Sequence, residues 1–237
     1  MIILCSSYSR FDLYSSYSKF ENLPEEKKKR ILDACIEEFS QNSYENASTN
    51  NIVKKAGISK GLLFHYFGSK KNLFIYVYDY ALEFFKEYIW EKLNKVISDS
   101  QTDFFERIMQ TALIKMRLVN EYPAIYAVVI NGLNVPNDLQ KEIRRSYEKV
   151  YKEYVALVLK NMDMSNFRKD IDRNKAIEII LFALEGISDK YVKMFKNMPA
   201  HEIFSKMESF AAEYYEYIDI LKGGVYGKGE LPHRDVQ

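Results

Sequence analysis

The stretch NASTNNIVKKAGISKGLLFHYFGSKKNL, residues 46–73, decides the fold of this chain. Ser48 and Thr49 are residue types that cap helix N-termini, and the apolar residues after them recur at helical spacing. Gly57 ends this first short helix, because glycine takes the left-handed cap conformation at little cost. Ser59 caps a second short helix, which a further glycine closes. A helix, a tight turn that holds a glycine and a second helix make up the helix-turn-helix pattern.

The charge of this stretch has one sign. Five lysines and no Asp or Glu lie between Asn46 and Asn72, namely Lys54, Lys55, Lys60, Lys70 and Lys71, whereas the whole protein has a net charge of +1. Lys70 and Lys71 stand in the first turn of the next helix, where the helix dipole disfavours cations unless an anion lies outside. Most lysine clusters are simply solvated surface. Here the turn geometry and the lack of acidic residues favour contact with DNA phosphates.

Residues at fixed spacing in this window resemble the N-terminal DNA-binding domain of TetR-type transcriptional regulators. They are Thr49, Ile52, Val53, Ala56, Gly57, Ile58, Ser59, Gly61, Leu63, Tyr66, Phe67, Ser69, Lys70 and Leu73. The run from Arg30 to Cys35, with Phe39 and Tyr44, resembles the first helix of the same family. The match covers about fifty residues, and so many agreements at fixed spacing are a specific signal. The C-terminal two-thirds of the chain shows no motif match.

The scarcity of glycine in the middle of the chain favours an all-α fold. Only Gly132 and Gly186 lie between the motif and the C-terminal tail. We expect about nine helices in all. The expected parts are a disordered extension (residues 1–22), the helix-turn-helix DNA-binding domain (23–72), an effector-binding and dimerisation domain (73–221) and a flexible tail (222–237).

Apolar periodicity predicts the helices outside the motif. They lie near residues 24–42, 69–96, 103–120, 123–131, 138–162, 175–197 and 201–221. The resembling family usually has a glycine where this chain has Ser43. We therefore expect Asn42 or Ser43 to take the left-handed conformation that ends the first helix.

The N-terminal extension contains two copies of one short pattern, SSYSRF at residues 6–11 and SSYSKF at residues 15–20. Two copies do not make a solenoid, and a disordered extension is the simpler interpretation. The alternative is a flexible arm that reaches the DNA minor groove through Arg10 or Lys19.

The resemblance implies that the second helix of the motif is the recognition helix. Leu63 and Phe67 are four residues apart and are expected to pack inward. The candidate DNA-binding residues are Thr49, Lys54, Lys55, Ser59, Lys60, Gly61, Leu62, Phe64, His65, Tyr66, Lys70 and Lys71.

These candidates have different expected roles. Four lysines, at positions 54, 55, 70 and 71, would contact phosphates, and Thr49 would cap the first short helix at the backbone. Gly61 would allow close approach of the backbone to DNA. Leu62 can touch a thymine methyl group but cannot hydrogen-bond a base edge. Phe64 lacks the hydroxyl of the family's usual tyrosine, so His65 or Tyr66 would supply that phosphate contact.

The resemblance further implies a repressor that a small hydrophobic or aromatic molecule releases from its operator. The candidate ligand-binding residues are Met109, Met116, Tyr122, Tyr126, Tyr151 and Phe182, for each of which ordinary core packing is an equally good interpretation. The last two helices are expected to form a homodimer, since a helix-turn-helix protein needs two half-sites about one DNA turn apart. The alternative is that their apolar faces complete the monomer core.

The sequence carries no signature of an enzyme. It contains no phosphate-binding loop, dinucleotide fingerprint or nucleophile elbow. His65, His201 and His233 lie far apart, without a Cys or His at ligand spacing, so we expect neither a metal nor a cofactor. Cys5 and Cys35 are isolated, and Cys35 falls on an apolar helix face as a buried free thiol.

No apolar run reaches the ~18–20 residues of a membrane span, so the expected compartment is the cytoplasm. The predicted function is a sequence-specific DNA-binding transcriptional regulator. The alternative is an architectural DNA-binding protein that has no effector and whose body serves for protein contact.

Overall fold

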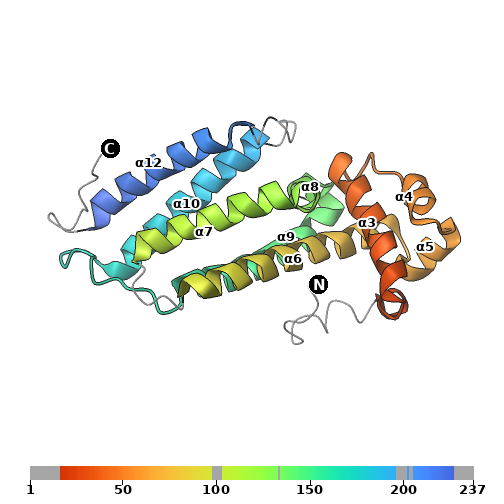
Figure 1. The fold of residues 1–237 in the computed structure, drawn as a ribbon, viewed down its shortest axis with the longest axis horizontal. Helices are drawn as coiled ribbons and strands as arrows, with labels where there is room; N and C mark the ends of the chain where they lie inside the picture. Colours follow the sequence, from red (N-terminus) through yellow and green to blue (C-terminus); the bar gives the residue numbers. More distant parts are fainter. Residues whose placement is uncertain (1–16, 98–102, 133, 196–201, 203–204, 227–237) are drawn as a thin grey trace. The chain divides into compact units, whose positions relative to one another are not determined.

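The computed structural model describes residues 17–97, 103–132, 134–195, 202 and 205–226 of the chain. Ten helices run through these residues, together with two isolated β-bridges and no β-strand, so the predicted all-α fold is confirmed (Figure 1). The helices are α2 (Ser18–Glu21), α3 (Glu25–Gln41), α4 (Thr49–Ala56), α5 (Lys60–Phe67), α6 (Lys70–Ile97), α7 (Phe104–Glu121), α8 (Pro123–Gly132), α9 (Asn137–Leu159), α10 (Arg173–Phe195) and α12 (Met207–Val225).

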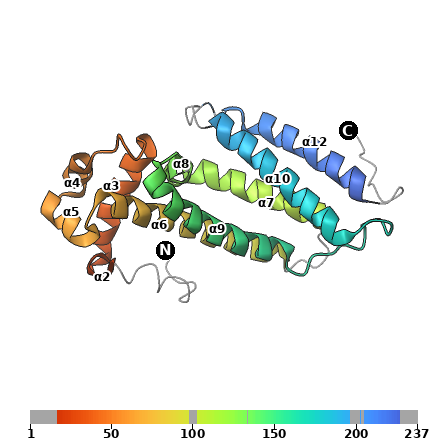
Figure 2. The same ribbon diagram turned by 180° about the vertical axis from the view of Figure 1, so that it is seen from behind.

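The chain forms two compact units. Unit 1 comprises Met1–Tyr88 and Glu121–Glu153, and unit 2 comprises Ile89–Asn120 and Tyr154–Gln237. Within unit 1, α4 and α8 both lie against α3, as the views from the front and from behind agree (Figures 1 and 2). The boundary expected after residue 72, between the DNA-binding domain and the effector-binding and dimerisation domain, stays a prediction.

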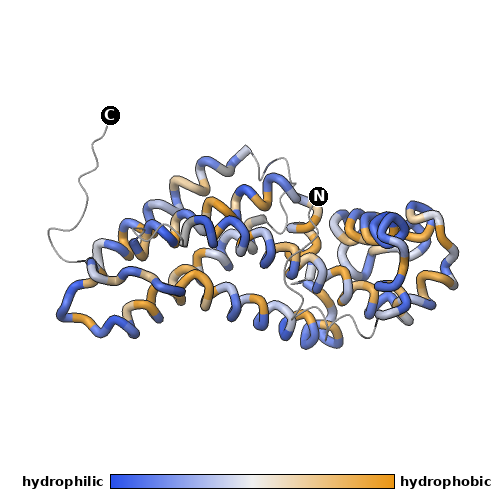
Figure 3. Tube along the Cα trace, turned by 60° about the horizontal axis from the view of Figure 1, so that its bottom comes forward, coloured by the Kyte–Doolittle hydropathy of each residue, from blue (hydrophilic) through white to orange (hydrophobic). Residues whose placement is uncertain are grey.

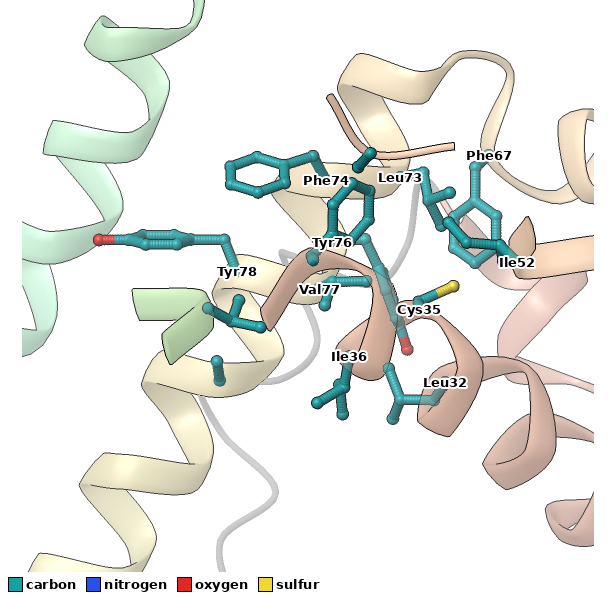
Figure 4. Packing of buried hydrophobic residues seen from close by; sticks show 14 of the residues in the cluster. Leu32, Cys35, Ile36, Ile52, Phe67, Leu73, Phe74, Tyr76, Val77 and Tyr78 are labelled. Carbon is teal, nitrogen blue, oxygen red and sulfur yellow. The ribbon is translucent and has the colours of Figure 1, made fainter. Parts of the chain in front are cut away.

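One face of α3 forms the centre of the core of unit 1. Its buried apolar residues recur at three- and four-residue spacing, and they are Ile31, Leu32, Ala34, Cys35, Ile36 and Phe39. Figure 4 shows part of this face gathered with Ile52 of α4, Phe67 of α5 and Leu73 of α6. Cys35 is a free cysteine, and burial raises the pKa of its thiol far above the usual range. A buried thiol of this kind is unreactive, in agreement with the prediction.

The turn after α3 is organised by a buried carboxylate. Glu38 is 3% exposed, and its Oε1 accepts a hydrogen bond from the backbone nitrogen of Ser48 at 2.8 Å. The Nδ2 atom of Asn42 also donates to this oxygen, at 3.2 Å. Asn42 has an extended backbone (φ −127°, ψ 144°), and Ser43 has no positive φ either. The predicted left-handed cap is therefore wrong, because side-chain hydrogen bonds end the helix instead.

A close contact at a glycine seats α8 in unit 1. A Cβ atom on Gly132 would lie 2.1 Å from the Cε2 atom of Tyr78, so a larger residue fits only if the ring moves. At the preceding residue, the Nδ2 atom of Asn131 donates to the carbonyl oxygen of Phe39 at 2.9 Å. These two contacts fix α8 against α3 and α6.

Unit 2 has a separate aromatic core between α7, α10 and α12. Its buried members are Phe104, Phe105, Ile108, Phe167, Ala176, Ile180, Ile218, Val225 and Tyr226. Beside them, the guanidinium group of Arg107 is buried and donates to the carbonyl oxygens of Val158 and Lys160. The mixture of hydrophobic and hydrophilic residues along these helices is visible in Figure 3. It is typical of amphipathic helices that bury one face.

Two predictions about the chain ends are corrected. The disordered extension is wrong for residues 17–22, because α2 is folded there and Phe20 is fully buried. The flexible tail is wrong for residues 222–226, because α12 continues to Val225 and Tyr226 packs in the core of unit 2. In both places aromatic burial outweighs a polar or glycine-rich composition. Residues 1–16, with Arg10, and 227–237 lie outside the described residues.

Within the described ranges, no helix combines the length and the hydropathy that a membrane crossing requires. The same residues contain no group of three or more His, Cys, Asp or Glu side chains placed to hold a metal ion.

Candidate nucleic-acid interface

Local capping builds the helix-turn-helix from α4 and α5. The Oγ atom of Ser48 accepts a hydrogen bond from the nitrogen of Asn51, and the Oγ atom of Ser59 accepts one from the nitrogen of Leu62 at 3.2 Å. Gly57, between the helices, has φ 62° and ψ 41°, the left-handed conformation that glycine adopts without strain. The predicted motif is therefore present. Thr49 is the first residue of α4, however, so its predicted role as the cap belongs to Ser48.

The recognition helix α5 has a buried side and an open side. Leu63 and Phe67 are buried, as predicted from their spacing. Tyr66 is buried as well, at 8% exposure, and its ring centre lies 5.9 Å from that of Phe20. The placement of Tyr66 on the DNA side is therefore wrong, because it lies three residues after Leu63 and shares the inward side. Lys60, Gly61 and His65 are exposed, and Leu62 and Phe64 are half-buried at the margins.

Gly61 is not required by the fold. A Cβ atom at this position would meet nothing within 4 Å, and its φ is not in the left-handed region. In this respect it differs from Gly57, whose positive φ makes any other residue strained. The space over Gly61 is open on the outer side of α5, where another molecule can approach the backbone.

The basic residues of the motif divide into free and paired lysines. Lys54 and Lys60 are exposed and have no protein partner among the described residues. Lys55 lies 2.6 Å from the Oε1 atom of Glu37 on α3. To contact a phosphate, Lys55 must therefore break or share its ion pair with Glu37, a pairing that the sequence pattern did not reveal.

The two lysines at the start of α6 are also engaged. The Nζ atom of Lys70 donates to the carbonyl oxygen of Glu45 at 3.0 Å, and partial burial lowers the pKa of Lys70. The Nζ atom of Lys71 donates to the carbonyl oxygen of Asp138 at 2.7 Å and lies 3.1 Å from the Oε1 atom of Glu142. Both lysines thus have protein partners, and their predicted contact with DNA phosphates stays a prediction. The ion pair of Lys71 with Glu142 is weak and screened by salt, so a DNA phosphate can compete for this lysine. Lys70 is held by a neutral backbone carbonyl, which does not neutralise its charge.

Residues 31–77, from the middle of α3 to the first turns of α6, match the family model described as bacterial regulatory proteins, tetR family. The part of the chain that holds the helix-turn-helix therefore carries the sequence pattern of TetR-family regulators. The family consists of regulatory proteins, in agreement with the resemblance seen in the sequence.

The relatives and solved structures that match the chain carry names of transcriptional regulators. The transcriptional repressor AcnR of Corynebacterium glutamicum is 22% identical over 213 residues, which cover 85% of this chain and 94% of AcnR. A TetR-family regulator from Chloroflexus aurantiacus has 22% identity and a TM-score of 0.52, over 89% of this chain and 98% of that one. FadR from Bacillus subtilis, solved in complex with stearoyl-CoA, has 15% identity and a TM-score of 0.54, over 84% and 99% of the two chains. At these identities the solved structures establish the fold.

The residues predicted to bind a ligand are divided between the two units. Tyr122, Tyr126 and Tyr151 belong to unit 1, whereas Met109, Met116 and Phe182 belong to unit 2. Two hollows lie on unit 1, and neither is lined by any of the six. Phe182 is 63% exposed, so its placement in an internal pocket is wrong for the single chain.

The remaining ligand candidates make ordinary packing contacts. The ring of Tyr126 stacks on Phe85 at 6.2 Å, and burial raises the pKa of its hydroxyl to about 12. Met109 packs against the aromatic core of unit 2. These residues fit the core interpretation as well as the ligand interpretation, and their role in ligand binding stays a prediction.

The two helices expected to form the dimer carry exposed apolar side chains. Ile179 and Phe182 of α10 are 62% and 63% exposed, and Ile220 of α12 is 72% exposed. Inside unit 2, α10 and α12 are joined by a hydrogen bond of 2.9 Å from the Tyr191 hydroxyl to the Oε2 atom of Glu213. The fold of one chain thus uses one side of this helix pair and leaves large apolar residues on another.

The sequence analysis missed the role of α2 in the DNA-binding domain. The segment precedes the part of the chain that resembles the family, and its Ser/Tyr-rich composition suggested disorder. Tyr17 and Phe20 stand three residues apart, which places both on one side of a helical turn. That spacing was the available signal, and it is too short to be distinguished from chance.

Proposed function

We propose that this chain is a homodimeric transcriptional regulator that reads duplex DNA with the outer face of α5. The observation that carries the proposal is the division of α5 into a side fixed by Leu63 and Phe67 and an open side with Lys60, Gly61 and His65. The open side contains no carboxylate, and Lys54 stands free on the preceding helix. A helix that carries basic residues and no acidic ones is suited to the negative charge of DNA. Its exposed glycine lets the backbone come close to the DNA surface.

The proposed mode of action is repression relieved by a ligand. AcnR is named a transcriptional repressor, and FadR was solved with stearoyl-CoA, a molecule with a long apolar chain. Both match this chain over more than four-fifths of its length. We infer an apolar or aromatic effector for this chain as well. A ligand releases DNA only if it binds the DNA-free conformation more tightly than the DNA-bound one.

The dimer is part of the proposal. The exposed Ile179, Phe182 and Ile220 provide apolar surface on α10 and α12 for a second copy. Two copies would place two α5 helices in successive major grooves about one DNA turn apart. The proposed protein works in the cytoplasm and needs no cofactor.

The test begins with selection of bound duplexes from random DNA, followed by titration at several salt concentrations. Lys54→Ala should weaken binding to every duplex and lower the slope of log K against log salt by about 0.9 for each subunit bound. The matched control is Lys152→Ala, which removes an exposed lysine of α9 away from the motif. Wild-type protein that binds no duplex even in dilute buffer would overturn the proposal.

A second test uses the open glycine of α5. Gly61→Ala should leave the free energy of unfolding unchanged or raise it by up to about 1 kcal/mol, because the fold has room for the methyl group. Binding to the selected duplex should fall by about tenfold or more if the backbone at this point approaches DNA. Gly223→Ala in α12 is the control, since a Cβ there also meets nothing within 4 Å. Equal DNA affinity of the two variants would contradict the assigned interface.

A second function deserves a test because the six ligand candidates are divided between the two units. In that alternative the protein binds DNA without an effector and the body serves for dimerisation or protein contact. Compounds with apolar chains or aromatic rings should be screened for release of the selected duplex. Release by a compound that leaves the free energy of unfolding intact supports the ligand-controlled repressor, and failure of the whole screen supports the alternative.

A further inference from the structure

The segment α2 is anchored beside the recognition helix by aromatic packing. Phe20 is fully buried, and its ring centre lies 4.8 Å from that of Phe67 and 5.3 Å from that of Tyr76. Tyr66 completes the cluster at 5.9 Å from Phe20. Because Tyr66 and Phe67 belong to α5, the position of α2 is fixed directly against the helix proposed to read DNA.

A second anchor holds the segment at the start of α6. The hydroxyl of Tyr17 donates to the carbonyl oxygen of Asn72 at 3.3 Å, and its ring lies 5.1 Å from the ring of Tyr76. The segment is therefore held on both sides of Lys19, the residue between these two aromatic anchors.

The charges of α2 are separated by these contacts. The carboxylate of Glu21 accepts a hydrogen bond from the hydroxyl of Tyr76 and lies 3.5 Å from the Nζ atom of Lys28. Lys19 is exposed and has no protein partner among the described residues. The acid of the segment is thus engaged by the protein, and the base is available to solvent.

A hollow of about 480 Å³ lies between α2 and α5. Its lining includes Ser18 and Lys19 of α2, Phe64 and His65 of α5, and Asn72 of α6, and it contains no Asp or Glu. His65 belongs to the open side of α5 that the proposed function places at the DNA, and Phe64 is half-buried at the margin of that side. The basic surface of the recognition helix therefore continues onto α2.

We propose that Lys19 contacts a backbone phosphate of the bound DNA, next to the groove that α5 reads. The aromatic anchors hold the lysine at the hollow that His65 also lines, and an ammonium group without a competing carboxylate is suited to a phosphate. α2 thereby extends the surface with which the DNA-binding domain contacts DNA beyond the helix-turn-helix itself. This inference rests on the proposed function, since it adds a contact to the same interface.

The test compares Lys19→Ala, Lys19→Glu and Lys19→Arg with Lys152→Ala by titration of the selected duplex and of a random one. Lys19→Ala should weaken both duplexes by the same factor and lower the salt slope by about 0.9 for each subunit bound. Lys19→Glu should weaken both further, and Lys19→Arg should retain wild-type affinity and slope. These substitutions lie on an exposed side chain, so the fold is expected to be unaffected.

Two outcomes separate this inference from the proposed function. If wild-type protein binds the selected duplex and Lys19→Ala and Lys19→Glu match the Lys152→Ala control, the contact does not exist. If wild-type protein binds no duplex, the proposed function itself fails. Ethylation interference on the selected duplex gives an independent result: at least one flanking phosphate should matter for wild-type protein and not for Lys19→Ala. An identical pattern for both proteins would overturn the assignment.

Discussion

The helices α5 and α10 are alike on the inside and different on the outside. Leu63 of α5 and Ile180 of α10 are both fully buried, each in the core of its own unit. On the outer surface, α5 carries the unpaired Lys60, whereas α10 carries Ile179 and Phe182 at more than 60% exposure. Both helices thus use their apolar residues to hold the fold, and only α10 has large apolar residues left over.

This difference indicates the chemistry of two partners. A helix that leaves a lysine, a histidine and an open glycine on its outer side fits a hydrated polyanion, because such a partner favours positive charge and close approach of the backbone. A helix that leaves isoleucine and phenylalanine in water fits an apolar surface, for which a second copy of the chain is the simplest source. We therefore propose that one chain carries a surface for DNA on unit 1 and a surface for its own dimer on unit 2.

The largest expected effect comes from the apolar surface. Replacing Phe182 and Ile220 by Glu should convert the dimer into a monomer, as measured by sedimentation. Affinity for the selected duplex should then fall by about 10²–10⁴-fold, because the two DNA-binding domains are no longer linked in one molecule. Trp90→Glu is the control, since Trp90 is 45% exposed but lies on α6. A dimer that survives the double substitution would show that these residues face water for another reason.

The next effect separates the two sides of α5. Leu63→Ala should lower the free energy of unfolding by about 2–5 kcal/mol, because it opens a cavity in the core. Leu62→Ala, at the half-buried margin, should cost less than about 1 kcal/mol and instead change the preference among selected duplexes. Urea denaturation measures the first quantity and competition titration the second. If both substitutions lower the free energy of unfolding by the same amount, the distinction between the buried side and the open side of α5 is wrong.

Local chemistry explains why the motif could be predicted from the sequence. Each of the caps, at Ser48 and at Ser59, joins the serine to a residue three positions later in the chain. The left-handed turn at Gly57 is likewise a local feature of the chain. The inward Leu63 and Phe67 follow from helical spacing alone. The same reasoning placed α6 to α10 within a few residues of their observed bounds.

Long-range contacts explain what could not be predicted. The pairing of Lys71 with Glu142 joins residues far apart in sequence, and nothing in the sequence tells which of the carboxylates of α9 the lysine meets. Helical spacing places Tyr66 on the same side of α5 as Leu63, but the ring that packs on it there, Phe20, comes from a segment whose composition suggested disorder. Phe182 looks like a core residue by its type, and only the packing of α10 leaves it on the outside.

A third prediction concerns the pH dependence of unit 1, which supports the α5 surface. Asp79 of α6 is 6% exposed, and its Oδ1 atom has no hydrogen-bond partner. Burial raises the pKa of its carboxyl group to about 6, aided by Glu83 and opposed by a hydrogen bond from Ser146 and by Lys149. Because the folded protein favours the protonated form, the free energy of unfolding should rise by about 1 kcal/mol as the pH falls from 7 to 5.

The matched variant is Asp79→Asn, which keeps the shape and removes the charge. It should remove this rise and be more stable than wild-type protein at pH 7, as measured by urea denaturation at pH 5, 6 and 7. DNA affinity per folded dimer should stay unchanged, because Asp79 is buried away from solvent. A wild-type stability that falls between pH 7 and 5 while Asp79→Asn stays level would show that the sign is wrong.

The smallest expected effect tests whether the lysines of α6 are held back from DNA. Glu142→Gln removes the carboxylate 3.1 Å from Lys71 but leaves the backbone acceptor at Asp138 in place. The Nζ atom then faces weaker competition, and affinity for the selected duplex should rise by at most about fivefold, since exposed ion pairs are weak. The control is Glu148→Gln, which breaks the exposed pair with Arg144 on the same helix. A loss of affinity would mean that Glu142 positions the start of α6 for binding, and the paired lysine would then belong to the framework and not to the DNA surface.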